Sequence, residues 1–108
     1  MTVVTVFRRV PKPIIGIGIL YDPDFERFQA NLDWLETTGV LVEQFDPALA
    51  QNEVAKRPTV RQMLSDEGNE CLPVILVNES VISRGRYLSR AQLARAVGQG
   101  QGWERSAA

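Results

Sequence analysis

Histidine is absent from this 108-residue chain, and cysteine occurs once, as Cys71. The absence of histidine removes the commonest general base, the commonest metal ligand and the side chain that titrates near neutral pH. A single cysteine excludes an intrachain disulfide and the paired thiols of thiol–disulfide exchange, and it favours a reducing compartment. We therefore expect no enzymatic activity, no metal site and no cofactor. Cys71 is either a reactive thiol or a structural one, and the second is favoured because no cationic partner is evident beside it.

Long apolar runs and an excess of one charge are also missing. The longest apolar run, 14–20, is too short to cross a bilayer, and its Gly16 and Gly18 lack the third glycine of a dinucleotide-binding loop. Twelve basic and thirteen acidic side chains leave a net charge of −1, which argues against nucleic-acid binding as the main task. The opening residues, 1–7, have no basic residue before them, unlike a signal peptide. We expect a cytoplasmic protein that does not contact a membrane.

The first half of the chain predicts strands at 2–6, 14–21 and 40–45, with a helix before the last of them. The run 14–21 is continuously apolar, which is typical of a strand buried on both faces of a parallel sheet. Asp22 and Pro23 predict the start of the helix, because aspartate caps a helix and proline suits its first turn. The helix ends near Gly39. Its apolar face has helical spacing and consists of Phe25, Phe28, Leu32 and Leu35.

The second half predicts a short helical turn at 51–56, a helix at 59–66, strands at 72–77 and 80–83, and a final helix. Ser89 and Gln92 have the spacing of a capping box at the start of that helix. Leu93, Ala94 and Val97 are expected on its inner side. The closing pair of strands is separated by two residues, which is typical of a hairpin.

The element order is βαβ, helix, β-hairpin, helix, which describes an α/β thioredoxin-like sandwich with a central mixed sheet of about four strands. Pro73 opens the third strand, at the place where this fold commonly has a cis peptide bond, so a cis Pro73 is expected. We predict a thioredoxin-like domain at 14–98. Residues 1–13 are then an N-terminal extension or an edge strand, and 99–108 form a flexible tail.

From Asp22 onward the chain resembles the ArsD family, which contains arsenical-resistance metallochaperones and trans-acting repressors. The segments that carry the resemblance are Trp34-Leu35, Gly39-Val40, 42–45, 58–60, Gly68, the LPVILV strand at 72–77, and Gly85-Arg86-Tyr87 with the helix start at Ser89. They cover about three-quarters of the chain. The resemblance implies a metalloid site made of a cysteine pair and a third cysteine, in the loop between the first strand and the first helix.

Three positions depart from the family pattern. The expected loop contains no cysteine, Glu79 stands where the family has a loop glycine, and Leu88 stands where it has a proline. Two alignments account for the loop. Either 3–7 is the first strand and the cysteine loop has become apolar, or 14–21 is that strand and the loop is deleted. We favour the second, because Asp22 and Pro23 then make a tight connection to a capped helix. Both imply that metalloid binding is lost.

Arginines and aromatic residues near the C-terminus are the candidate interaction residues. They are Arg84, Arg86, Tyr87, Arg90 and Trp103. With Arg95, Lys56 and Arg57 the arginines form either a basic surface or solvated side chains in local ion pairs, and the second is the commoner case. Trp103 either anchors a partner or folds back onto its own domain.

Structural roles are expected for Asp22, Pro23, Pro73 and Gly85. Helix capping explains Asp22, Asp24 and Glu26 better than acid–base catalysis does.

The resemblance and the missing thiols together predict a non-catalytic ArsD-like binding protein. Its expected role is that of an accessory, assembly or regulatory partner of an ATPase or metalloenzyme subunit, because the family's partner is an ATPase. The alternative is transcription regulation by a homodimeric repressor that binds DNA, which requires a basic face across the dimer. A redox enzyme that uses Cys71 is a third and weaker hypothesis.

Overall fold

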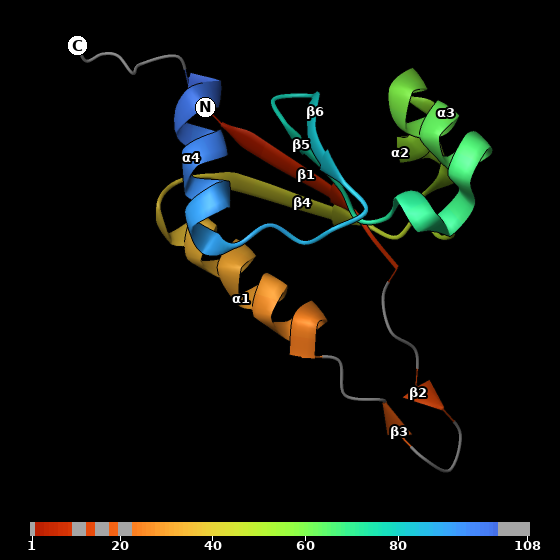
Figure 1. The fold of residues 1–108 in the computed structure, drawn as a ribbon, viewed down its shortest axis with the longest axis horizontal. Helices are drawn as coiled ribbons and strands as arrows, with labels where there is room; N and C mark the ends of the chain where they lie inside the picture. Colours follow the sequence, from red (N-terminus) through yellow and green to blue (C-terminus); the bar gives the residue numbers. More distant parts are fainter. Residues whose placement is uncertain (1, 10–12, 15–17, 20–22, 102–108) are drawn as a thin grey trace.

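The computed structural model describes residues 2–9, 13–14, 18–19 and 23–101. Its main sheet has four strands in the order β4-β1-β5-β6, formed by β1 (Val3–Phe7), β4 (Leu41–Phe45), β5 (Val74–Val77) and β6 (Ser80–Arg84) (Figure 1). β1 pairs parallel with β4 and antiparallel with β5, and β5 pairs antiparallel with β6. The predicted mixed sheet and thioredoxin-like architecture are confirmed.

The position of β1 corrects the favoured alignment. Val3–Phe7 is an interior strand bonded on both sides, neither an extension nor an edge strand. Its side chains are buried on both faces of the sheet, as a continuous β-branched and aromatic segment allows. The run at 14–21 contributes instead to β2 (Pro13–Ile14) and β3 (Gly18–Ile19), which pair antiparallel with each other in a separate sheet. An apolar run alone does not distinguish a core strand from a hairpin.

Helices cover the two faces of the sheet unequally (Figure 1). α1 (Pro23–Thr37) and α4 (Arg90–Gln101) lie on one face. The core between them and the sheet contains Val4, Val6, Phe28, Leu32, Leu35, Val40, Ile75, Val77, Leu88, Leu93 and Val97. α2 (Gln51–Ala55), α3 (Pro58–Glu67) and the 3-10 turn η1 (Gly68–Cys71) pack on the other face, against a core of Phe7, Val54, Val60, Cys71, Val74 and Leu76.

Several predicted boundaries are confirmed. Gly39 follows α1 with φ of +94°, in the region that favours glycine, and the Leu72–Pro73 peptide bond is cis. Ser89 and Gln92 form both bonds of the capping box. The Gln92 backbone N–H donates to Ser89 Oγ at 3.2 Å, and the Ser89 N–H donates to Gln92 Oε1 at 2.9 Å.

The inner side of α4 differs in one position from the prediction. Leu93 and Val97 are buried as expected, but Ala94 is exposed and Ala96 packs against the core in its place. α4 also extends through Gln101, into the segment expected to be a tail. Asp22, Trp103 and the rest of 102–108 lie outside the described residues. Within the described ranges, no helix is both long and apolar enough to span a bilayer.

Candidate functional site

Arg8 directly follows β1, at the start of the connection that leads to α1. The Arg8 backbone N–H donates to the Phe45 carbonyl at 3.0 Å, which continues the pairing of β1 with β4. Strand alternation places the Arg8 side chain on the face of Val4 and Val6, beneath α1. The residue is 2% exposed, which is rare for arginine unless its hydrogen bonds are satisfied.

Contacts from three elements hold the Arg8 guanidinium. Nη2 donates to Gln29 Oε1 on α1 at 2.5 Å and to Gln44 Oε1 on β4 at 2.8 Å. Nη1 donates to the Phe25 carbonyl at 3.4 Å. The guanidinium carbon lies 3.8 Å from the centre of the Phe25 ring, and the Tyr87 ring lies 5.8 Å away. Arg8 therefore joins β1, β4, α1 and the loop before α4.

That loop, 85–89, is fixed by backbone contacts at its start. Gly85 has φ of +77°, and its N–H donates to the carbonyls of Cys71 and Pro73 at 2.8 and 3.0 Å. A side chain there is strained because of the positive φ. Gly85 therefore ties the start of the loop to Cys71 and to Pro73, the residue that follows the cis peptide bond. Tyr87 then packs on Phe28, with ring centres 4.8 Å apart.

A groove of about 480 Å³ lies between the N-terminal ends of α1 and α4. It is lined by Asp24, Arg27, Phe28, Asn31, Arg86, Tyr87, Leu88, Ser89 and Gln92. The structure therefore brings two of the predicted interaction residues, Arg86 and Tyr87, to one groove. Arg90 lies beside it, where its Nε donates to Asn31 Oδ1 at 3.1 Å and its guanidinium lies over the Trp34 ring at 5.3 Å.

Arg84 does not join this groove. It forms an ion pair with Glu67 of α3, on the other side of the sheet edge. Lys56 and Arg57 are also engaged in ion pairs, so the hypothesis of local ion pairs describes these three residues. The remaining exposed cations of the basic set are Arg86, Arg90 and Arg95.

Cys71 is closed to solvent. It is 1% exposed in η1, and its thiol lies 3.2 Å from the Gly68 carbonyl. Burial, and then the charge of Glu67, raise the pKa of the Cys71 thiol above its ordinary value. Because the thiolate is the reactive and ligating form, this environment favours the structural interpretation of Cys71.

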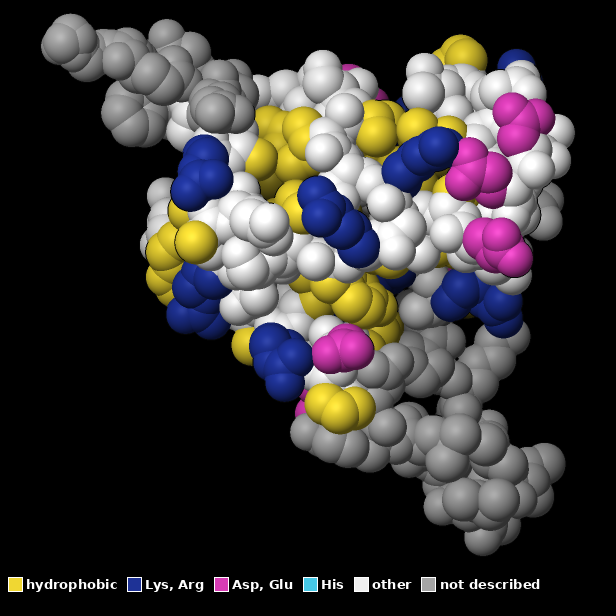
Figure 2. Space-filling view, viewed as in Figure 1, with side chains coloured by type: hydrophobic (Ala, Val, Ile, Leu, Met, Phe, Trp, Pro, Cys, Tyr) yellow, Lys and Arg dark blue, Asp and Glu magenta, His cyan; other side chains and the backbone are white. Residues whose placement is uncertain are grey.

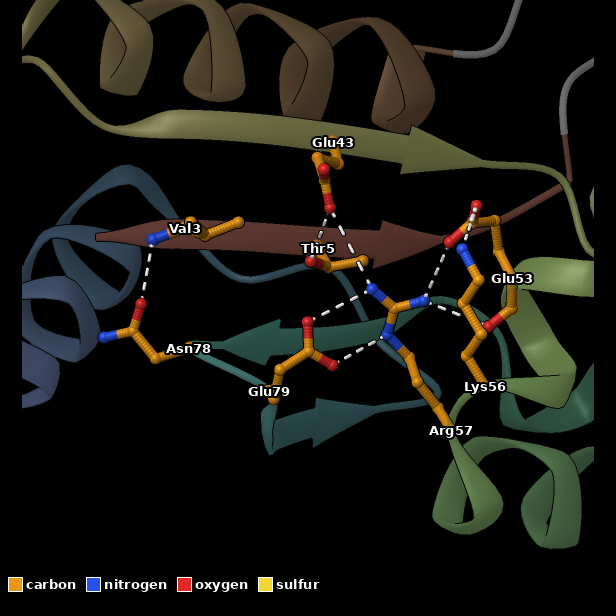
Figure 3. A network of polar contacts seen from close by, with 8 residues as sticks. All are labelled: Val3, Thr5, Glu43, Glu53, Lys56, Arg57, Asn78 and Glu79. Carbon is orange, nitrogen blue, oxygen red and sulfur yellow. Dashed lines mark hydrogen bonds and ion pairs between the residues drawn. The ribbon is translucent and has the colours of Figure 1, made fainter. Parts of the chain in front are cut away.

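A second arginine, Arg57, organises the opposite face of the sheet (Figure 3). Its Nε and Nη2 donate to the two carboxylate oxygens of Glu79 at 2.8 and 3.1 Å. Nη1 donates to Glu53 Oε1 at 3.2 Å, and Glu43 Oε1 lies 3.9 Å from Nη2. The hydrogen bond to Glu79, with that to Glu53, raises the pKa of Arg57 above its ordinary value.

Glu79, which stands where the family resemblance implies a loop glycine, belongs to this network. Asn78 and Glu79 form the β5–β6 turn. Their φ angles of +49° and +71° lie in the left-handed region, which favours glycine. The Val3 N–H donates to Asn78 Oδ1 at 2.9 Å, so the turn is also tied to β1. The glutamate at the second position of this turn binds Arg57 in bidentate geometry, and this contact offsets part of the cost of its positive φ.

Arg8 and the Arg57–Glu79 pair are not among the predicted site residues. A signal for Arg8 exists in the alternation of β1, which places Arg8 on the α1 face and Arg9 on the other. No local pattern indicates the pairing of Arg57 with Glu79, because the two are far apart in sequence. Within the described part of the chain, no three His, Cys, Asp or Glu side chains form a group that could hold a metal ion.

Comparison with known proteins identifies the family. A model of the family described as arsenical resistance operon protein ArsD matches residues 1–107. The chain belongs to the ArsD family. Two arsenical resistance operon trans-acting repressors named ArsD, both from Escherichia coli, are similar to it. One is 30% identical over 99 residues, covering 91% of this chain and 82% of that protein.

The other ArsD relative is 32% identical over 71 residues, which cover 66% of this chain and 59% of that protein, less than two-thirds of its length. A crystal structure of an arsenical resistance operon trans-acting repressor from Bacteroides vulgatus ATCC 8482 has a TM-score of 0.73. It covers 91% of this chain and 93% of that one at 20% identity, a likeness that shows the fold alone. In this ArsD-family chain the residues after β1 are Arg8 and Arg9.

Proposed function

We propose that this ArsD-family protein is a non-catalytic binding protein that has lost metalloid binding. Its role is that of an accessory, assembly or regulatory partner of an ATPase or metalloenzyme complex in the cytoplasm. The observation that carries the proposal is the combination of an ArsD-family match over residues 1–107 with a buried arginine after β1, near the loop where the family resemblance implies cysteines. The one cysteine, Cys71, is buried elsewhere.

Loss of metalloid binding is tested by equilibrating the full chain with arsenite, removing free arsenite by gel filtration, and measuring arsenic and protein in the same fractions. A family member with the cysteine triad serves as positive control. The expected result is no arsenic in the protein fractions, since one buried thiol does not replace three. Stoichiometric retention of arsenic would overturn the proposal.

The accessory role is tested by tagging the chromosomal copy and purifying the protein under native conditions. A stoichiometric ATPase or metalloenzyme subunit in the purified complex is the expected result. Recovery of the protein alone, as a stable monomer, from cells that express it at its natural level would count against the role.

Transcriptional repression is the second candidate function. Both relatives from Escherichia coli are named trans-acting repressors, and residues 80–101 contain four arginines and no acidic residue. A repressor would bind its promoter fragment in a mobility-shift assay, with an affinity that falls steeply as salt is raised. Equal, weak binding to promoter and unrelated DNA would exclude this function.

A further inference from the structure

Charge is distributed unevenly in this nearly neutral chain. Residues 80–101, which form β6, the loop 85–89 and α4, contain four arginines and no acidic residue, so the acidic excess belongs to the rest of the chain. Figure 2 shows Lys and Arg side chains spread over α4, the loop that leads into it and the start of α1. Most Asp and Glu side chains on this face gather over α3. Residues 80–101 therefore present a positive face.

Two arginines of this face have no ion-pair partner among the described residues. Arg86 and Arg95 are exposed, and neither takes part in an ion pair among the described residues. Arg84 differs from them because Glu67 neutralises it. Arg90 has its guanidinium placed between Asn31 and the Trp34 ring. Arg86 and Arg95 are thus available to an incoming anion.

Apolar side chains line the grooves to which these two arginines belong. The groove beside Arg86 has Phe28, Tyr87 and Leu88 in its lining. A second groove, of about 460 Å³, runs between β6 and α4 and is lined by Val77, Asn78, Ser80, Ile82, Leu88, Gln92, Arg95 and Ala96. Both grooves contain Leu88 and Gln92, so they adjoin. We call the two grooves together the α4 trough.

We propose that the α4 trough binds an acidic amphipathic segment of a partner protein. Apolar side chains of the segment lie on the floor at Ile82, Leu88 and Ala96, and its carboxylates pair with Arg86 and Arg95. This inference rests on the proposed function, since it names the chemistry of the partner. Burial of apolar side chains supplies affinity, and the two charge contacts supply orientation and selectivity.

A protein segment fits the trough better than nucleic acid does. Phosphate backbones are bound by many closely spaced cations, whereas each groove of this trough is lined by one arginine without an ion pair together with apolar side chains. The acidic side chains over α3 would also repel a duplex that extends past the trough.

Strand addition to β6 is disfavoured as the mode of binding. The pairing of β5 with β6 shifts register between Ile75 and Leu76, which leaves Ile82 as the extra residue of a bulge. A bulge interrupts the row of backbone groups that an added strand requires. Side chains of the partner, rather than its backbone, therefore make the contact.

The test uses the full isotopically labelled chain and a synthetic amphipathic helix with one leucine face and one glutamate face. A peptide in which lysine replaces every glutamate is the control for charge, and a short DNA duplex is the control for nucleic acid. Amide shifts should change at residues 82–96. In anisotropy titrations, the double variant Arg86→Glu/Arg95→Glu should weaken binding at least about tenfold, and Ile82→Ser about threefold.

Arg61→Glu is the control variant for each single reversal, Arg86→Glu and Arg95→Glu, because Arg61 is an exposed arginine on α3 and each of the three reversals changes the net charge by the same amount. It should change the affinity less than about twofold. Equal weakening by Arg61→Glu would overturn the proposal, as would shifts elsewhere on the surface, equal binding of the lysine peptide, or tighter binding of DNA at the trough.

The failure of this inference is distinguishable from failure of the proposed function. Capture of the same native partner by the wild type and by Arg86→Glu/Arg95→Glu would support the accessory role and overturn the proposal that the partner binds at the α4 trough. Recovery of no native partner, with the acidic peptide still bound at the trough, would overturn the accessory role and keep the binding site.

Discussion

Arg8 and Arg57 lie on opposite faces of the same sheet and are held in different ways. Arg8 is 2% exposed, and its contacts include two amide oxygens, a backbone carbonyl and the face of Phe25. Arg57 binds three carboxylates, of which the closest, that of Glu79, is 58% exposed. Arg8 is part of the packed interior, whereas Arg57 belongs to a network that water and salt reach. The difference predicts unequal contributions to stability.

The largest effect is expected for Arg8→Met. The substitution leaves the Gln29 and Gln44 oxygens without a charged donor and leaves space beside Phe25, so we expect a loss of about 3 kcal/mol in unfolding free energy. Urea unfolding followed by far-UV circular dichroism measures it. Arg9→Met is the matched control, since its side chain is exposed, and should change stability by less than about 0.5 kcal/mol. Similar losses in both variants would show that burial of Arg8 has no special role.

Arg57→Met should have a smaller effect, about 1.5 kcal/mol, because the carboxylates released by the substitution can be solvated. Raising the salt concentration sharpens the comparison. Screening weakens exposed ion pairs more than buried contacts, so the loss caused by Arg57→Met should shrink at high salt. The loss caused by Arg8→Met should stay nearly constant. If the loss of unfolding free energy were independent of salt for both variants, the Arg57 network would not differ from the Arg8 site in its exposure to screening.

The two arginines also differ in how much of their environment could be predicted from sequence. Strand alternation predicts that Arg8 points toward α1, once Val3–Phe7 is recognised as the interior strand. The favoured alignment was wrong because the longer apolar run at 14–21 is the stronger strand pattern, although the side chains of β1 are buried on both faces of the sheet. Helix starts and ends were predictable, since caps and glycines are local signals. The Arg57–Glu79 pair depends on tertiary contact and has no local signal.

Two substitutions of Glu79 distinguish the contribution of backbone strain to stability from that of the ion pair with Arg57. Glu79→Ala keeps a side chain at φ of +71° and loses the ion pair, so it should destabilise the protein by about 1 kcal/mol. Glu79→Gly also loses the pair but relieves the strain, so its stability should stay within about 0.5 kcal/mol of the wild type. Thermal unfolding of the three proteins gives the order. An alanine variant as stable as the glycine variant would show that the turn is unstrained.

The smallest effect is expected from protonation of Glu53. Hydrogen bonds from Lys56 and then Arg57 lower the pKa of the Glu53 carboxyl below its ordinary value. A lowered folded-state pKa contributes stability that is present above the unfolded-state pKa and is lost as pH falls through the folded-state pKa. Glu53→Gln should therefore be less stable than the wild type at about pH 7, and the difference should shrink as the pH falls below the ordinary carboxyl pKa and through the lowered folded-state pKa of Glu53.

Arg57→Met supplies the control for this pH dependence. In that background one of the two hydrogen bonds that lower the pKa of Glu53 is gone, so Glu53→Gln should cost less stability near neutral pH than it does in the wild type. A Glu53→Gln effect of the same size with and without Arg57 would mean that Lys56 alone holds the carboxylate. The contact of Arg57 with Glu53 would then contribute nothing to stability, and the pair with Glu79 would be the main contact of Arg57.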